Sequence, residues 1–261
     1  MKPQLVLLHG WAVNSLIWNS ILDQLHARYD VTILDLPGYG AQVNYNGSYD
    51  LETVVAEVLS RAPDVANWIG WSLGGTIALA AAMAQPQRFE KLQLISTTPK
   101  FLNSEHWSHG VDIEPFEALS LGFESDYSKS LKRFLLLQTF SEDPAEKKKG
   151  ITLARELSGI LAQTEPPPSQ QTLQSGLELL RQTDLRDQLG KLTIPTQVIA
   201  GRSDRVVPMA ASKHLFDELG NDNLDHSFKS LPGGHLPFLQ STSDYIGCLE
   251  EFIPSNSAGE S

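Results

Sequence analysis

Six short apolar runs, separated by helix-like stretches, constrain the fold of this chain more than any other feature of its sequence. Continuous apolar character, bounded by glycine and proline, is typical of strands that are covered on both faces. Helices between such strands are typical of a parallel sheet. The runs are QLVLLHG (4–10), DVTILDLPG (30–38), ANWIG (66–70), KLQLIST (91–97), TQVIAG (196–201) and HSFKSLPG (226–233). We therefore predict an α/β fold with a mostly parallel sheet flanked by helices.

The alternation stops between the fourth and fifth runs. From about Lys100 to Leu192 the sequence is helical, with a PPP break at 166–168 and no strand alternation. We predict a core made of residues 1–99 and 193–254 and a helical insertion at residues 100–192. Insertions over the carboxyl edge of a parallel sheet commonly act as lids, so we name this segment the lid. The polar residues 255–261 are expected to form a disordered tail.

Composition excludes several classes of protein. The net charge of −11 argues against nucleic-acid binding. The single cysteine, Cys248, excludes an internal disulfide framework and suits a reducing compartment. The apolar run near the N-terminus is too short for a signal peptide or a membrane span. We expect a soluble, cytoplasmic monomer that does not bind membranes.

One serine stands between the third apolar run and an alanine-rich helical pattern. The stretch Gly70-Trp71-Ser72-Leu73-Gly74 matches G-x-S-x-G, in which a sharp strand-to-helix turn lifts the serine hydroxyl clear of the sheet. A side chain at either glycine would crowd that turn. Taken alone, the match fits equally well with a glycine-rich helix start that Ser72 merely caps.

A serine hydroxyl is a weak nucleophile and needs a base that is itself oriented by a third group. In α/β-hydrolases the chain order is serine, then acid, then histidine, each just after a strand. Asp204 follows TQVIAG and His235 follows the last apolar run, in the glycine-rich segment PGGHLPF. Each has a structural alternative: Asp204 could be a turn residue, and His235 could bond a backbone carbonyl. Their joint order and placement favour a Ser72, Asp204, His235 triad.

Acyl transfer also needs donors for the developing oxyanion. We expect one from the backbone N–H of Leu73 and the other from the loop after the first run, where Trp11 follows a His-Gly pair. The Trp11 indole could face substrate or belong to the core. His9, at a strand end, is expected to make a structural hydrogen bond. No metal or cofactor is expected, because no His, Cys, Asp or Glu cluster has ligand spacing.

These motifs carry a family resemblance. LLHGW, DLPGYG, GWSLGG, SDRVVP and GGHLPF resemble α/β-hydrolases of the serine carboxylesterase type over most of the chain. The lid segments RFLLLQT (133–139) and SGLELLRQTDLRDQL (175–189) resemble the pimeloyl-[acyl-carrier protein] methyl ester carboxylesterases of biotin biosynthesis. That resemblance implies hydrolysis of a methyl ester carried by acyl-carrier protein. Hydrolases of this family usually begin with a β-hairpin, and only four residues precede Leu5 here; we expect this to affect the sheet edge more than catalysis.

Two groups of lid residues are candidate binding residues. Residues 129–155 hold seven Lys and Arg against three Asp and Glu, a local charge of +4. Such a patch could steer an acidic carrier protein or could be a solvated face. The candidate partner-binding residues are Lys129, Lys132, Arg133, Lys147, Lys148 and Lys149. The candidate substrate-binding residues are Phe134, Leu135, Leu136, Leu137 and Gln138, of which the four apolar ones could line an acyl channel or form the lid core.

The sequence leaves two other functions open. A carboxylesterase, thioesterase or lyase of the same fold could act on an unrelated small ester, because fold and triad do not fix the substrate. A hydrolase-fold receptor could keep the triad and only bind a ligand, and steady turnover of simple esters would count against it. We favour a serine carboxylesterase in which Ser72 attacks, His235 moves the proton and Asp204 orients the imidazole.

Overall fold

A parallel sheet forms the centre of the molecule. The computed structural model describes residues 1–163, 166–220 and 224–255. Within these residues the sheet has six strands in the order β2-β1-β3-β4-β5-β6, each parallel to its neighbours. The strands are β1 (Gln4–Leu8), β2 (Asp30–Leu34), β3 (Ala66–Trp71), β4 (Phe89–Ile95), β5 (Thr196–Gly201) and β6 (Ser227–Leu231). All six predicted strands and the predicted parallel sheet are confirmed.

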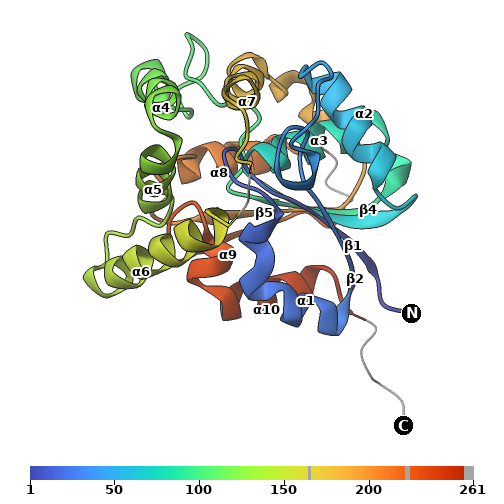
Figure 1. The fold of residues 1–261 in the computed structure, drawn as a ribbon. Helices are drawn as coiled ribbons and strands as arrows, with labels where there is room; N and C mark the ends of the chain where they lie inside the picture. Colours follow the sequence, from blue (N-terminus) through green and yellow to red (C-terminus); the bar gives the residue numbers. More distant parts are fainter. Residues whose placement is uncertain (164–165, 221–223, 256–261) are drawn as a thin grey trace.

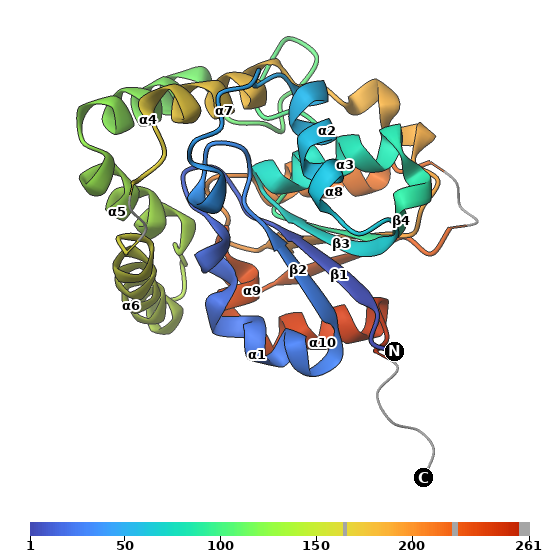
Figure 2. The same cartoon turned by 45° about the vertical axis from the view of Figure 1, so that its right-hand side comes forward.

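Helices cover both faces of the sheet (Figures 1 and 2). On one face lie α1 (Asn19–Arg28) and α10 (Thr242–Phe252); on the other lie α2 (Leu51–Arg61), α3 (Leu73–Ala84) and α8 (Met209–Asp217). Because helices cover both faces, side chains on both sides of a central strand are buried, which explains the continuously apolar sequences. In β3 every residue is buried. Short helices η1 (Ser15–Trp18), η2 (Gly40–Gln42), η3 (Pro86–Arg88) and α9 (Pro237–Gln240) shape the loops between these elements.

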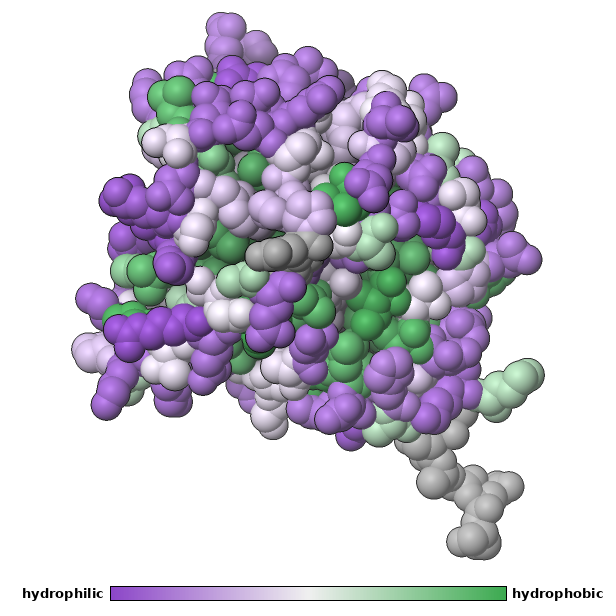
Figure 3. Space-filling view, in the orientation of Figure 1, coloured by the Kyte–Doolittle hydropathy of each residue, from purple (hydrophilic) through white to green (hydrophobic). Residues whose placement is uncertain are grey.

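Strand β2 lies at one edge of the described sheet, and β6 lies at the other. Strand β2 is less buried than the strands at the centre, and its Val31 and Ile33 are only partly buried. A hydrophobic area lies over this side of the molecule in Figure 3.

The chain between β4 and β5 forms the lid. It contains α4 (Ile113–Ser125), α5 (Tyr127–Gln138), α6 (Pro144–Leu161), α7 (Gln170–Gln182) and the 3-10 helix η4 (Arg186–Lys191). The Asp143 carboxylate accepts hydrogen bonds from the amides of Ala145 and Glu146, so Asp143 is the N-cap of α6. The Glu146 carboxylate pairs with Lys149 at 2.8 Å. Residues 256–261, most of the predicted disordered tail, lie outside the described residues.

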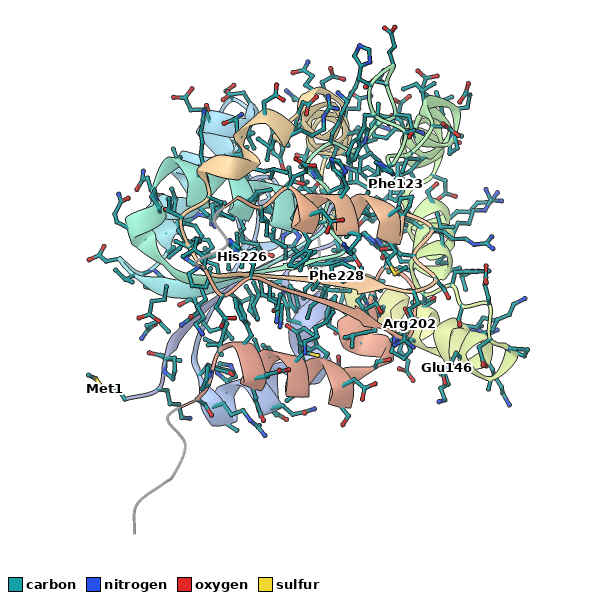
Figure 4. All side chains as sticks on the ribbon, turned by 180° about the vertical axis from the view of Figure 1, so that it is seen from behind. Met1, Phe123, Glu146, Arg202, His226 and Phe228 are labelled. Atoms are coloured by element: carbon teal, nitrogen blue, oxygen red, sulfur yellow. The ribbon has the colours of Figure 1, made fainter. Side chains whose placement is uncertain are left out.

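The lid packs at the edge where the parallel strands end. Leu8, the last residue of β1, lies beside Leu34 of β2 and Gly70 of β3, so these three strands end at one edge. Figure 4 shows the same polarity for β5 and β6: His226, just before β6, lies away from the lid, whereas Arg202, just after β5, lies on the side of Glu146 in α6. Among the described residues, no helix combines the length and apolar character needed to cross a bilayer.

Candidate active site

Ser72 occupies a sharp turn between β3 and α3. Its backbone has φ 56° and ψ −122°, a conformation that non-glycine residues rarely adopt and that is typically held in place by its surroundings at functional sites. A Cβ at Gly70 would come within 2.6 Å of the Gly75 Cα, and a Cβ at Gly74 would overlap the His9 carbonyl oxygen. The two glycines therefore let β1, β3 and α3 approach closely enough to form the turn.

Asp204 and His235 meet at the ends of β5 and β6. Asp204 Oδ2 lies 2.8 Å from His235 Nδ1, and both side chains are almost completely buried. The other carboxylate oxygen, Oδ1, accepts hydrogen bonds from the amides of Val206 and Val207 at 2.8 and 2.9 Å. These two amides fix the carboxylate, which in turn fixes the imidazole. The structure thus brings together the acid and the histidine predicted from their chain order.

The imidazole of His235 lies next to the turn that carries Ser72. Its ring centroid is 5.4 Å from that of Trp71, the residue before Ser72, and the Trp71 indole donates to the His235 carbonyl at 2.8 Å. His235 Nε2 is buried and has no hydrogen-bond partner among the described residues. Because Nδ1 faces Asp204, Nε2 is the nitrogen left to accept a proton. The absence of a bond from Ser72 Oγ to Nε2 is compatible with catalysis, because catalytic hydrogen bonds are often long before substrate binds.

One predicted oxyanion donor, Leu73, follows Ser72 in the chain, and the other, Trp11, follows Gly10 in the loop after β1. Leu73 is the first residue of α3, and the amides of a first helical turn have no partner within the helix and carry partial positive charge. The loop after β1 passes over the serine: a Cβ at Gly10 would lie 3.1 Å from the Ser72 Cβ. The Trp11 amide follows Gly10 directly. The backbone amides of Leu73 and Trp11 therefore stay the candidate oxyanion donors.

His9 supports this loop through hydrogen bonds and not through acid-base chemistry. Its Nε2 accepts the amide N–H of Leu36 at 3.0 Å, so Nδ1 carries the proton and donates to the Gly10 carbonyl at 2.8 Å. Burial lowers the pKa of His9 from the ordinary 6.5 and outweighs the opposing effect of the Asp35 carboxylate. The expected structural hydrogen bond of His9 is confirmed.

Sequence and structure comparisons place the chain in a known family. Residues 3–242 match the family described as "alpha/beta hydrolase fold". The chain belongs to the α/β-hydrolase family. It is 37% identical to the pimeloyl-[acyl-carrier protein] methyl ester esterase of Xylella fastidiosa over 96% of this chain and 95% of the relative. It is 33% identical to the esterase of the same name from Vibrio parahaemolyticus, over 96% and 94%.

Solved α/β-hydrolase structures share the fold at lower identity. An esterase from Exiguobacterium antarcticum superposes with a TM-score of 0.82 at 24% identity, covering 97% of this chain and 92% of its own. A bromoperoxidase from Bacillus anthracis gives a TM-score of 0.83 at 22% identity, with the same coverage. At these identities the likeness shows the fold alone, so the chemistry of this hydrolase has to be argued from its own site.

Trp11 joins the hydrolase core to the lid. Its indole N–H donates to the Leu173 carbonyl in α7 at 2.9 Å, and its ring packs edge-on against Phe123 of α4 and Phe134 of α5. A Cβ at Gly176 of α7 would lie 2.8 Å from the indole. Only 3% of Trp11 is exposed, so its indole is a buried contact between core and lid. Sequence reasoning missed these partners, although a glycine inside helix α7 was a visible sign of a close approach.

The predicted substrate segment divides between the two sides of helix α5. Phe134, Leu135 and Gln138 are buried, whereas Leu136 and Leu137 are 45% and 41% exposed. Consecutive residues on an α-helix point about 100° apart, so four neighbours do not line one channel. Leu136 instead lines a surface cavity of about 300 Å³ with residues of α6. The sequence left open whether these four apolar residues line an acyl channel or form the lid core. Phe134 and Leu135 are buried, as lid-core residues would be, whereas Leu136 and Leu137 are exposed. Contact of any of them with an acyl chain stays a prediction.

Gln138 and the end of α5 contact the loop that carries His235. The Gln138 carbonyl accepts the His235 amide at 2.6 Å, and the Gln138 side-chain oxygen is buried without a partner among the described residues. Gln240 donates to the Thr139 carbonyl at 3.0 Å and accepts the Gly234 amide at 2.8 Å. The last turn of α5 thus lies against the histidine loop.

The basic lid residues are all exposed. Lys129, Lys132 and Arg133 lie on α5, and Lys147, Lys148 and Lys149 lie in the opening turns of α6. Much of the lid surface near α6 is hydrophilic in Figure 3. A separate cavity of about 530 Å³ lies between the 48–51 loop and α7, and its lining includes none of Ser72, Asp204 and His235.

Proposed function

We propose that this chain is a serine carboxylesterase that hydrolyses the methyl ester of pimeloyl-[acyl-carrier protein], the reaction that the family resemblance assigns to biotin biosynthesis. The observation that carries the proposal is the buried Asp204–His235 pair beside the strained Ser72 turn. The substrate rests on the relatives at 33–37% identity, which match over almost the whole chain.

In the first half of the reaction, Ser72 Oγ attacks the ester carbonyl carbon while His235 Nε2 takes the hydroxyl proton. The tetrahedral oxyanion is held by the amides of Leu73 and Trp11. Asp204 stabilises the imidazolium and keeps its Nδ1 protonated. The bond to the methoxy oxygen then breaks, and the leaving oxygen receives the proton from His235. Methanol departs and the acyl group remains on Ser72.

In the second half, water attacks the acyl-serine. His235 takes a proton from the water, and the same two amides hold the second oxyanion. The bond to Ser72 Oγ breaks, and the proton returns from His235 to that oxygen. The products are the free carboxylate on the carrier and the regenerated serine. Every step uses groups of the chain and water, with no co-reactant.

The lid supplies contacts to the acyl chain and to the carrier in this proposal. Phe134 packs against the Trp11 ring and the Gln138 carbonyl accepts the His235 amide, so we assign substrate contact to these two buried residues of α5. Acyl-carrier protein is acidic, and the basic residues of α5 and α6 would attract it. Lys132 and Arg155 flank the cavity lined by Leu136, Ile151 and Ala154, which would give the carrier an apolar contact between two cations.

The proposal is tested by growth. A biotin-requiring strain that lacks its methyl esterase should grow without biotin when this chain is supplied, and the Ser72→Ala variant should not restore growth. Purified wild-type protein should also release methanol from the carrier-linked ester. Turnover of p-nitrophenyl esters without growth would favour a general short-chain esterase. Binding of esters without any turnover would favour a receptor.

Carrier docking is tested by a matched pair of charge reversals. Lys132→Glu should lower kcat/KM for the carrier-linked ester about three- to tenfold and leave p-nitrophenyl butyrate unaffected, because small esters need no docking. Lys191→Glu changes the net charge equally but lies outside the α5–α6 surface, in η4. The difference between the two variants should shrink as salt rises. Equal losses in both variants would assign the effect to overall charge and leave Lys132 on a solvated face.

A further inference from the structure

Helix α5 contacts both loops that carry the catalytic groups. Its last turn accepts the His235 amide through the Gln138 carbonyl. Its first residue, Tyr127, reaches the other loop: the phenol hydroxyl donates to the Ala12 carbonyl at 3.2 Å. Phe134, between these ends, packs against the Trp11 indole with ring centroids 5.5 Å apart. One lid helix thus spans from the oxyanion loop to the histidine loop.

The oxyanion loop needs such support at Ala12. This residue has φ 63°, in the left-handed region that alanine avoids because its Cβ crowds the backbone. Ala12 follows Trp11 directly, and the direction of the Trp11 amide depends on how the chain turns there. A strained turn persists when its surroundings over-determine it. A hydrogen bond to the Ala12 carbonyl is one of the contacts able to do so.

Tyr127 is suited to give that hydrogen bond throughout the working pH range. Its ring packs against Phe123, with centroids 5.7 Å apart, and most of the side chain is covered. Burial raises the pKa of Tyr127 to about 12, so the hydroxyl stays protonated and remains a donor at neutral and alkaline pH.

We infer that Tyr127 is a positioning residue for the oxyanion hole: through the Ala12 carbonyl, its hydroxyl holds the loop in the turn that aims the Trp11 amide at the reacting carbonyl. The inference rests on the oxyanion role given to Trp11 in the proposed function. It adds that the lid takes part in the chemical step on any ester and not only in the choice of substrate.

The test compares Tyr127→Phe with Tyr29→Phe. Both changes remove one tyrosine hydroxyl that donates to a backbone carbonyl and keep the ring. Tyr29 donates to the Ile253 carbonyl at 2.7 Å, at the α1 and α10 face of the sheet. With p-nitrophenyl butyrate, Tyr127→Phe should lower kcat about three- to tenfold with KM unchanged, the size expected for losing one supporting hydrogen bond. Tyr29→Phe should keep wild-type kcat.

An inhibitor that forms an oxyanion on Ser72 gives a second readout. A trifluoromethyl ketone should bind Tyr127→Phe more weakly by the same factor as the loss in kcat, because both report stabilisation of the oxyanion. The inference is overturned if kcat of Tyr127→Phe equals that of Tyr29→Phe, or if only KM rises. Failure to restore growth, with the kcat loss present, would reject the physiological substrate and leave the inference standing.

Discussion

Replacing Asp204 by asparagine is expected to change the tautomer of His235 while the shape of the site stays nearly the same. Asp204 Oδ1 accepts two backbone amides, from Val206 and Val207, while Oδ2 faces His235 Nδ1. An asparagine has one oxygen, and the two amides require an acceptor. The NH₂ group of the asparagine must therefore face Nδ1, where it is a donor. This arrangement favours the imidazole tautomer whose proton is on Nε2, which is unable to accept the proton of Ser72.

The expected loss in kcat arises because only a small fraction of the variant has the tautomer with its proton on Nδ1, which is the one able to accept the Ser72 proton. The same replacement in a Ser-His-Asp hydrolase costs about 10⁴-fold in kcat, equivalent to about 5.4 kcal/mol of transition-state stabilisation. We expect a similar loss here, because the Asp204 carboxylate is buried and is held by the same kind of contacts. The melting temperature should change little, because asparagine has nearly the same volume as aspartate.

The measurement is kcat on p-nitrophenyl butyrate, with Asp217→Asn as the matched control. Asp217 lies on α8, is half-exposed and pairs with Lys213, so its replacement removes the same charge away from the site. The control should keep wild-type activity. If Asp204→Asn retained more than about one-tenth of wild-type kcat, against the 10⁴-fold loss expected, the third member of the triad would lie elsewhere.

Two further predictions concern the turn and its support. Gly74→Ala should destabilise the fold by about 1–3 kcal/mol, because its Cβ would overlap the His9 carbonyl. In the control Gly159→Ala on α6, the new Cβ meets no atom within 4 Å, so this change should stabilise the fold by about 0.5–1 kcal/mol. Urea unfolding compares the two variants, and equal effects would contradict the packing argument. The folded-state pKa of His9 is lowered, so its contribution to stability is complete above pH 6.5 and decreases as pH falls below it. Between pH 7.5 and 5.5, wild type should lose more unfolding free energy than His9→Gln, and parallel losses would show that His9 does not titrate in this way.

The sequence predicted the sheet and the candidate triad because their signals are local. An apolar run bounded by glycine marks a strand wherever it lies in the chain, and parallel strands bring the residues after them to one edge. Ser72, Asp204 and His235 each stand in the loop that follows the end of a strand, so their meeting required only the strand order. The same reasoning placed His9 at a structural hydrogen bond, since it stands where β1 ends.

The contacts between lid and core were outside the reach of that reasoning. The bond from Trp11 to Leu173 joins residues 162 positions apart, and the bond from Tyr127 to Ala12 joins residues 115 positions apart. Neither hydrogen bond is signalled by a motif or a periodicity, because each depends on how the helices of the lid pack against the core. The outward direction of Leu136 and Leu137 was missed for a different reason, since their neighbours were read as one apolar group without the helical period.

The core carries the groups proposed to perform the reaction, and the lid carries the features able to select the substrate, but the two roles are not completely separate. Ser72, Asp204 and His235 belong to loops after core strands, and the surrounding glycines would serve any ester. The lid carries the exposed cations and the cavity beside Leu136, which are the features able to distinguish a carrier-linked ester from a free one. Yet the indole of Trp11, whose amide is a proposed oxyanion donor, is bonded to α7, and the loop beyond it is bonded to α5. A change in the lid that selects a different substrate therefore also acts on the oxyanion hole, so specificity and rate are expected to vary together in lid variants of this chain.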